Sequence, residues 1–76
     1  MNHTVPLPAG TIEILLDGQP RPVAAGTTLA ALVASLGHAP AAVSTAVNGD
    51  FVPRGQRERP LAVSDVVLLF QPIVGG

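Results

Sequence analysis

The 76-residue chain contains no cysteine, no lysine, no tyrosine and no tryptophan, and its only aromatic residues are Phe51 and Phe70. Without cysteine it can form neither a disulfide nor a thiolate metal site, and it has no thiol nucleophile. Without tyrosine or tryptophan it lacks a platform on which the bases of single-stranded nucleic acid stack. Any chemistry that involves this chain must therefore use other groups.

Charge and long apolar runs are also scarce. Four arginines face five acidic residues, for a net charge of -1, so no basic stripe is available for nucleic acid. No apolar run approaches the ~20 residues of a membrane span, and the N-terminus lacks the basic and apolar regions of a secretion signal. We expect one small cytoplasmic domain with no nucleic-acid or membrane partner and no room for a deep active-site cavity.

The first half of the domain predicts a hairpin. Residues 11–16 alternate apolar side chains at period two, and Asp17-Gly18 is a tight-turn pair that leads into a second strand over residues 19–23. Pro20 and Pro22 alternate in this second strand. Since proline cannot donate a backbone hydrogen bond, we expect this strand at an edge of the sheet.

A helix follows, with apolar residues at helical spacing at Leu29, Leu32, Val33 and Leu36. Thr27 or Thr28 can cap its N-terminus, and Gly37 supplies a left-handed stop. We expect the apolar stripe to pack on Ile12, on Ile14 and on the inward face of the last strand.

The second half predicts three more strands. Residues 42–47 are predicted to be a strand, and residues 51–53 a short strand that pairs back on it. Asn48-Gly49 between them is a preferred hairpin pair, to which we assign only a turn. Residues 54–60 form a polar connector with room for a single helical turn, and residues 66–71 form the last strand. The chain is therefore predicted to be an α+β domain, a mixed sheet with one main helix.

The last strand is apolar on both faces. Val66, Leu68 and Phe70 lie on one face, and Val67 and Leu69 lie on the other. One helix can cover only one of these faces. Either the strand curls so that loops bury both faces, or an exposed apolar patch remains, which usually marks a protein partner; we favour the patch.

The sequence ends on Val74-Gly75-Gly76. Residues 1–10 show no period and are expected to be a flexible extension, residues 11–71 the domain, and residues 72–76 a flexible tail. Residues 71–76 can extend ~20 Å at ~3.3 Å per residue. Glycine lets the backbone and its terminal carboxylate approach another protein closely.

The order of elements, two strands, a helix and two strands as the common core, resembles the ubiquitin-like β-grasp fold. Within it, the runs 46–54 (Ala-Val-Asn-Gly-Asp-Phe-Val-Pro-Arg) and 68–76 (Leu-Leu-Phe-Gln-Pro-Ile-Val-Gly-Gly) resemble the ThiS-type sulfur carriers of thiamin biosynthesis. The resemblance covers residues 11–76. The chain departs from the usual pattern in having residues 1–10, and in having Ser64-Asp65 where a Gly-Asp turn is common.

The resemblance implies a protein co-substrate rather than an enzyme, with no metal and no bound cofactor. The carboxylate of Gly76, presented by Gly75, would be adenylated by a ThiF-type adenylyltransferase that uses ATP. It would then become a thiocarboxylate with sulfur from a cysteine desulfurase or another donor, and thiazole synthase would receive the sulfur. The lack of lysine would protect such an activated carboxyl from amines, although a GC-rich genome explains it more simply.

The residues expected to contact these partners are Arg54, Val67, Leu69, Gln71, Pro72, Ile73 and Val74. For Arg54 a plain solvated role is equally consistent with the sequence. Two other functions stay open. The small subunit of molybdopterin synthase shares the fold and the diglycine, but its tail tends to read Pro-Pro-Val-x-Gly-Gly, of which this chain has only Pro72. A β-grasp interaction module with an incidental diglycine is the third possibility.

Overall fold

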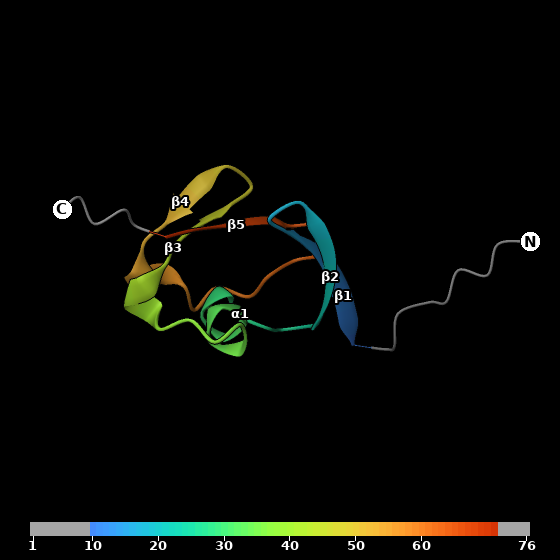
Figure 1. Cartoon of the computed structure of the whole chain (residues 1–76). Coiled ribbons are helices and arrows are strands. Elements are labelled where there is room, and N and C mark those ends of the chain that lie inside the picture. Colours follow the sequence, from blue (N-terminus) through green and yellow to red (C-terminus); the bar gives the residue numbers. More distant parts are fainter. Residues whose placement is uncertain (1–9, 72–76) are drawn as a thin grey trace, which may run out of the picture.

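The computed structural model describes residues 10–71, which form a five-stranded sheet with one α-helix on one side (Figure 1). In chain order the elements are β1 (Thr11–Leu16), β2 (Gln19–Ala24), α1 (Leu29–Ser35), β3 (Ser44–Val47), β4 (Asp50–Val52) and β5 (Val66–Phe70). Two 3₁₀ turns, Pro40–Ala42 and Arg54–Gln56, follow α1 and β4. The predicted order of elements is confirmed.

The element boundaries differ from prediction by one or two residues. The third strand begins at Ser44 rather than at residue 42, because Pro40 starts a 3₁₀ turn that occupies the preceding residues. The single helical turn predicted in the polar connector is the turn Arg54–Gln56. The last strand ends at Phe70, one residue before the predicted end.

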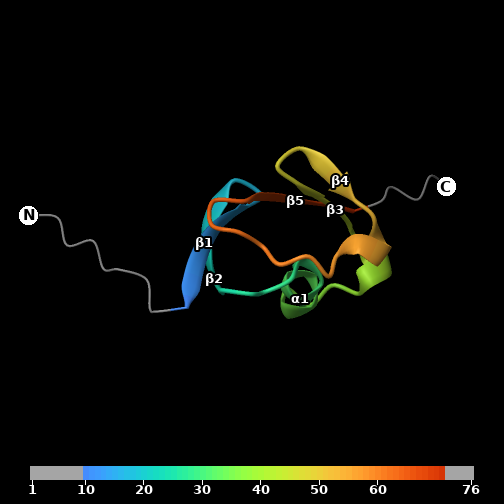
Figure 2. The ribbon, with the colours of Figure 1, turned by 180° about the vertical axis from the view of Figure 1, so that it is seen from behind.

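The sheet has the order β2-β1-β5-β3-β4. Strands β1 and β2 form one antiparallel hairpin, and β3 and β4 form the other. Strand β5 lies between the two hairpins, parallel to β1 and antiparallel to β3. The two views show the sheet curving around α1 (Figures 1 and 2). The proline-containing strand β2 lies at an edge, as predicted.

Both hairpins turn through two residues with positive φ. These are Asp17 (φ 49) with Gly18 (φ 84), and Asn48 (φ 54) with Gly49 (φ 86). Turns of this kind match the right-handed twist of the flanking strands, so the turn residues set the register of both hairpins. Ser64 also has positive φ (φ 67), a conformation that favours glycine and so accounts for a glycine being common there.

The helix begins and ends where its sequence predicts. Thr28 Oγ1 accepts a hydrogen bond from the Ala31 backbone N–H at 3.0 Å, and Gly37 has a φ of 85. Leu29 and Leu32 pack in the core with Ile14 and the inward face of β5 at Val67. Leu36 and Ile12 lie at the margin of this core, half-buried. The predicted packing on the sheet is confirmed for Leu29, Leu32 and Leu36, whereas Val33 is buried outside this cluster, on the side of Pro40 and Arg57.

Asp65 joins the second hairpin to the start of β5. Its buried carboxylate accepts hydrogen bonds from Asn48 Nδ2 at 2.9 Å and from the Ala62 N–H at 2.8 Å. Asn48 Oδ1 in turn accepts from the Val66 N–H at 2.9 Å. The assignment of Asn48 to a turn is right but incomplete, because its amide also ties that turn to β5.

Replacing Leu32 by alanine should destabilise the domain, because this almost fully buried side chain lies in the core that α1 and the sheet share. A Leu→Ala change in a core costs ~2–5 kcal/mol, so the melting temperature measured by circular dichroism should fall by at least about 8 °C. Ala34→Ser, on the exposed side of α1, is the control and should leave the melt nearly unchanged. Equal melting temperatures for the two variants would mean that Leu32 of α1 does not contribute to the core.

Replacing Asp65 by alanine should also destabilise the domain, since it leaves two N–H groups without their acceptor. The expected cost is about 1–3 kcal/mol, seen as a lower urea midpoint with an unchanged slope. Asp50→Ala, at an exposed acidic residue in β4, is the matched control. If both variants unfold at the same urea concentration, the Asp65 network does not stabilise the hairpin.

Candidate functional site

The inward face of β5 is the one that sequence analysis assigned to partners. Val67 is fully buried, and its neighbours in the sheet are Leu16 and Val47. Leu69 is half-buried and packs against the same core. A residue with no exposed surface cannot contact a partner, so the prediction for Val67 is wrong, and Leu69 also belongs to the helix side. The pairing of β5 with β1 and β3 decides this orientation.

The exposed apolar surface lies instead on the other side of the sheet. Phe51, Phe70 and Val66 are 65%, 48% and 37% exposed, and Leu68 is half-buried. Leu68 pairs with Ala46, which pairs with Phe51, so side chains from three strands share this side. We call the surface made by Phe51, Val66, Leu68 and Phe70 the outer face. The expectation that one helix leaves an apolar face exposed is confirmed.

The end of β5 is held on both sides. Ser44 of β3 pairs with Phe70, the last residue of the strand. On the β1 side, the Asp17 N–H donates to the Val67 carbonyl at 2.9 Å, and Asp17 Oδ1 accepts from the Leu69 N–H at 3.1 Å. The point from which the chain continues beyond the sheet is therefore fixed by backbone and side-chain hydrogen bonds.

Of the residues that follow β5, the structure describes only Gln71. Gln71 is exposed. Pro72, Ile73, Val74, Gly75 and Gly76 lie outside the described residues, as does nearly all of the predicted N-terminal extension 1–10. The predictions for the tail and for that extension therefore stay predictions.

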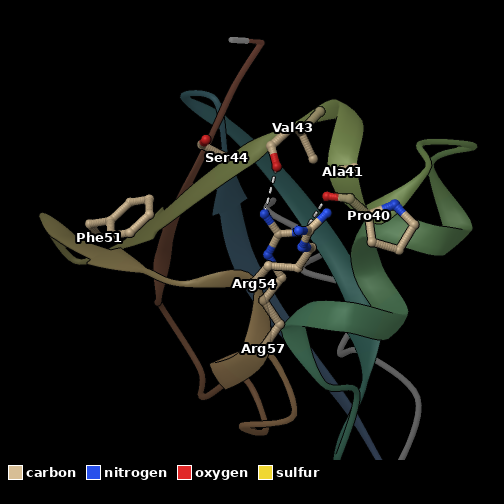
Figure 3. A pocket seen from close by; sticks show the side chains of 7 residues that line it. All are labelled: Pro40, Ala41, Val43, Ser44, Phe51, Arg54 and Arg57. Atoms are coloured by element: carbon tan, nitrogen blue, oxygen red, sulfur yellow. Dashed lines mark hydrogen bonds between the residues drawn. The ribbon is translucent and has the colours of Figure 1, made fainter.

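A hollow of about 250 Å³ lies beside the outer face (Figure 3). Its lining comes from the 3₁₀ turn Pro40–Ala42, from β3, from β4 and from the connector: Pro40, Ala41, Val43, Ser44, Phe51, Arg54 and Arg57. Arg54, a predicted partner residue, is exposed here. Ser44 is half-buried, and Phe51 belongs both to the hollow and to the outer face.

Arg57 is the residue that sequence analysis missed. Its side chain is only 4% exposed. Nη1 donates to the Pro40 carbonyl at 2.9 Å and Nη2 to the Val43 carbonyl at 2.6 Å (Figure 3). Nε donates to Thr45 Oγ1 at 3.2 Å. Nothing in the polar run 54–60 distinguishes Arg57 from its exposed neighbours, because its acceptors come from a distant part of the sequence.

No group of three or more histidine, aspartate, glutamate or other metal-binding side chains gathers anywhere in residues 10–71. Among these residues, no helix is long and apolar enough to cross a membrane. Within the same range, the features that stand out chemically are the outer face, the hollow with its two arginines, and the fixed end of β5 beside both.

The known proteins that this chain resembles share its architecture. The crystal structure of a thiamine biosynthesis protein (ThiS) from Geobacter metallireducens is similar, with a TM-score of 0.72 and 23% sequence identity. The match covers 86% of this chain and 100% of that one. At this identity the likeness shows the fold, so the mixed five-stranded sheet with one helix is a β-grasp, as predicted. A search of curated proteins finds no match. The model of the ThiS family, however, matches residues 12–76, nearly the whole sequence, and the chain therefore belongs to the ThiS family.

Proposed function

We propose that this protein is a sulfur carrier of thiamin biosynthesis that bears its sulfur as a thiocarboxylate on Gly76. The observation that carries the proposal is the family match over residues 12–76, a range that includes the β-grasp domain and the diglycine. The position of β5 supports it, since the central strand of the sheet ends at Phe70, directly before the tail.

The chemistry needs an external enzyme. A carboxylate is a poor electrophile until one oxygen becomes part of a good leaving group. The Gly76 carboxylate would attack the α-phosphate of ATP, releasing pyrophosphate and forming an acyl adenylate. A persulfide sulfur then displaces AMP and gives an acyl disulfide, whose S–S bond is cleaved by a thiol, so that the thiocarboxylate leaves and a disulfide forms from the two thiol sulfurs; a hydrosulfide ion would give the thiocarboxylate directly. The carrier itself contributes a reachable carboxyl group, and glycines at its last two positions keep side chains out of the partner's channel.

The protein would act as a co-substrate in the cytoplasm. Its partners would be a ThiF-type adenylyltransferase, a cysteine desulfurase or other sulfur donor, and thiazole synthase. Two sequence features favour this role over the small subunit of molybdopterin synthase, namely the Val52-Pro53-Arg54 element and the single proline, Pro72, before the diglycine. Transfer of sulfur to thiazole synthase, rather than to the large subunit of molybdopterin synthase, separates the two roles.

The outer face is the surface we propose for docking on the adenylyltransferase. It is apolar, it includes two phenylalanines, and it flanks the strand that leads to the tail. Aromatic anchors of this kind dominate the energetics of many protein interfaces. A partner seated on this face would hold the end of β5 in place while the tail enters its active site.

Deleting Gly76 should abolish both adenylation and sulfur gain while leaving the fold unchanged. The deletion withdraws the carboxylate by about 3.3–3.6 Å, too far for attack on a bound nucleotide. Gly75→Val should fail similarly, because a branched side chain would press on the channel wall. The test is reconstitution with the adenylyltransferase, ATP and a sulfur source, followed by intact mass, where exchange of one oxygen for sulfur adds about 16 Da.

The wild-type protein must gain this mass, and both variants must melt as the wild type does. If the protein lacking Gly76 gains sulfur at the wild-type rate, the terminal diglycine is not the reactive group. If the wild type itself gains none, the chain is an interaction module rather than a carrier.

Replacing Phe51 by serine should weaken recognition by the adenylyltransferase, because it removes the most exposed ring of the outer face. We expect the KM for the carrier to rise roughly tenfold or more, with little change in stability. Ala34→Ser, at an exposed position of α1 on the other side of the sheet, is the control. Equal KM values for the two variants would mean that the adenylyltransferase binds a surface other than the outer face.

A further inference from the structure

Positive charge is concentrated in one short segment of this acidic chain. Residues 54–59 hold three of the four arginines, Arg54, Arg57 and Arg59, against one acid, Glu58. The rest of the sequence has one arginine against four acidic residues. The connector after β4 is therefore a local positive region on a molecule that is negative elsewhere.

The buried arginine of this segment lacks a carboxylate partner. The three hydrogen bonds of Arg57 end on two carbonyls and one hydroxyl, all of them neutral. These acceptors satisfy the N–H donors of Arg57, but because they are neutral they do not compensate its positive charge. A charge removed from water acts more strongly on its surroundings than a solvated one. Arg57 thus supplies a fixed positive field beneath the hollow.

Arg54 adds a second, accessible guanidinium to the lining of the same hollow. Glu58 lies near both arginines and lines the neighbouring hollow with them. Across residues 10–71, however, no carboxylate oxygen lies within 4.0 Å of a guanidinium nitrogen of either arginine, so neither forms an ion pair. Two cations around one open hollow, with the Ser44 hydroxyl on its wall, make a site that attracts an anion.

The surroundings indicate which anion. Phe51 lines the hollow and also belongs to the outer face, so the two surfaces are continuous. A protein that covers the outer face would pass over the hollow as well, and a carboxylate fits the bidentate geometry of a guanidinium. A free inorganic anion would gain nothing from the exposed ring beside it.

We propose that the hollow receives an acidic side chain of the adenylyltransferase, which pairs with Arg54 in the field of Arg57. This inference rests on the proposed function and deepens it, because it names a charged contact that orients the carrier on the enzyme. Arg54 is the residue to vary. Arg57 is unsuitable, since removing its hydrogen bonds would disturb the fold.

The test compares Arg54→Gln with Arg59→Gln in the pyrophosphate-release assay of the adenylyltransferase. Both variants lose one exposed charge from the same connector, but Arg59 does not line the hollow. We expect a roughly tenfold rise in KM for Arg54→Gln alone, with kcat nearly unchanged. Arg54→Lys, which keeps the charge, should recover most of the loss. Raising the salt from about 50 to about 300 mM should raise the wild-type KM more than that of Arg54→Gln.

Each other outcome overturns the inference in a distinguishable way. Equal KM values for Arg54→Gln and Arg59→Gln, with the wild type adenylated, reject the charged contact and leave the carrier function intact. A wild type that is not adenylated rejects the proposed function and the contact together. If inorganic phosphate alone shifts the backbone amide resonances of Arg54 and Ser44 with a Kd of about 1 mM, the hollow is a small-anion site. Dimers that depend on Arg54 in the absence of enzyme would make the occupant a second copy.

Discussion

The structure depends on the position of β5. This strand joins the two hairpins, pairing parallel with β1 and antiparallel with β3, and its fully buried Val67 contacts the core beneath α1. Because β5 is central, β3 pairs with it over residues 67–70 and β1 at Val66 and Val67, and Asp17 accepts a further hydrogen bond from the Leu69 N–H. Because it is also the last strand, the chain leaves the sheet from a strand that is paired with both hairpins. One strand thus supports the fold, carries three of the four residues of the outer face and ends where the proposed reactive tail begins.

Local signals in the sequence were enough to predict the element order and the turns. Asp17-Gly18 and Asn48-Gly49 adopt positive φ because short polar residues and glycine tolerate it, and Thr28 caps α1 because its hydroxyl accepts from the first turn. The inward face of β5 could not be predicted in the same way. Both faces are apolar, so alternation distinguishes two faces without saying which is inside. Only the pairing with β1 and β3 turns Val67 toward the helix.

The hollow was hidden from sequence analysis for a related reason. Arg57 lies among exposed polar residues, and its acceptors at Pro40, Val43 and Thr45 are brought to it by the fold. A buried arginine with neutral acceptors holds the 3₁₀ turn, β3 and the connector together. The same contacts leave its charge uncompensated beside the exposed Arg54. A structural role and a positive field toward the proposed partner therefore arise from one side chain, and the outer face and the hollow form one continuous surface next to the end of β5.

The measurement that tests this account most directly is nuclear magnetic resonance of the isotope-labelled protein with the unlabelled adenylyltransferase. The methyl signals of Val66 and Leu68 and the ring signals of Phe51 and Phe70 should shift or broaden on binding. The methyl signals of Ala31 and Ala34, on the exposed side of α1, should not change. Changes confined to α1, with the outer face unaffected, would contradict the claim that β5 presents the tail and the docking surface together.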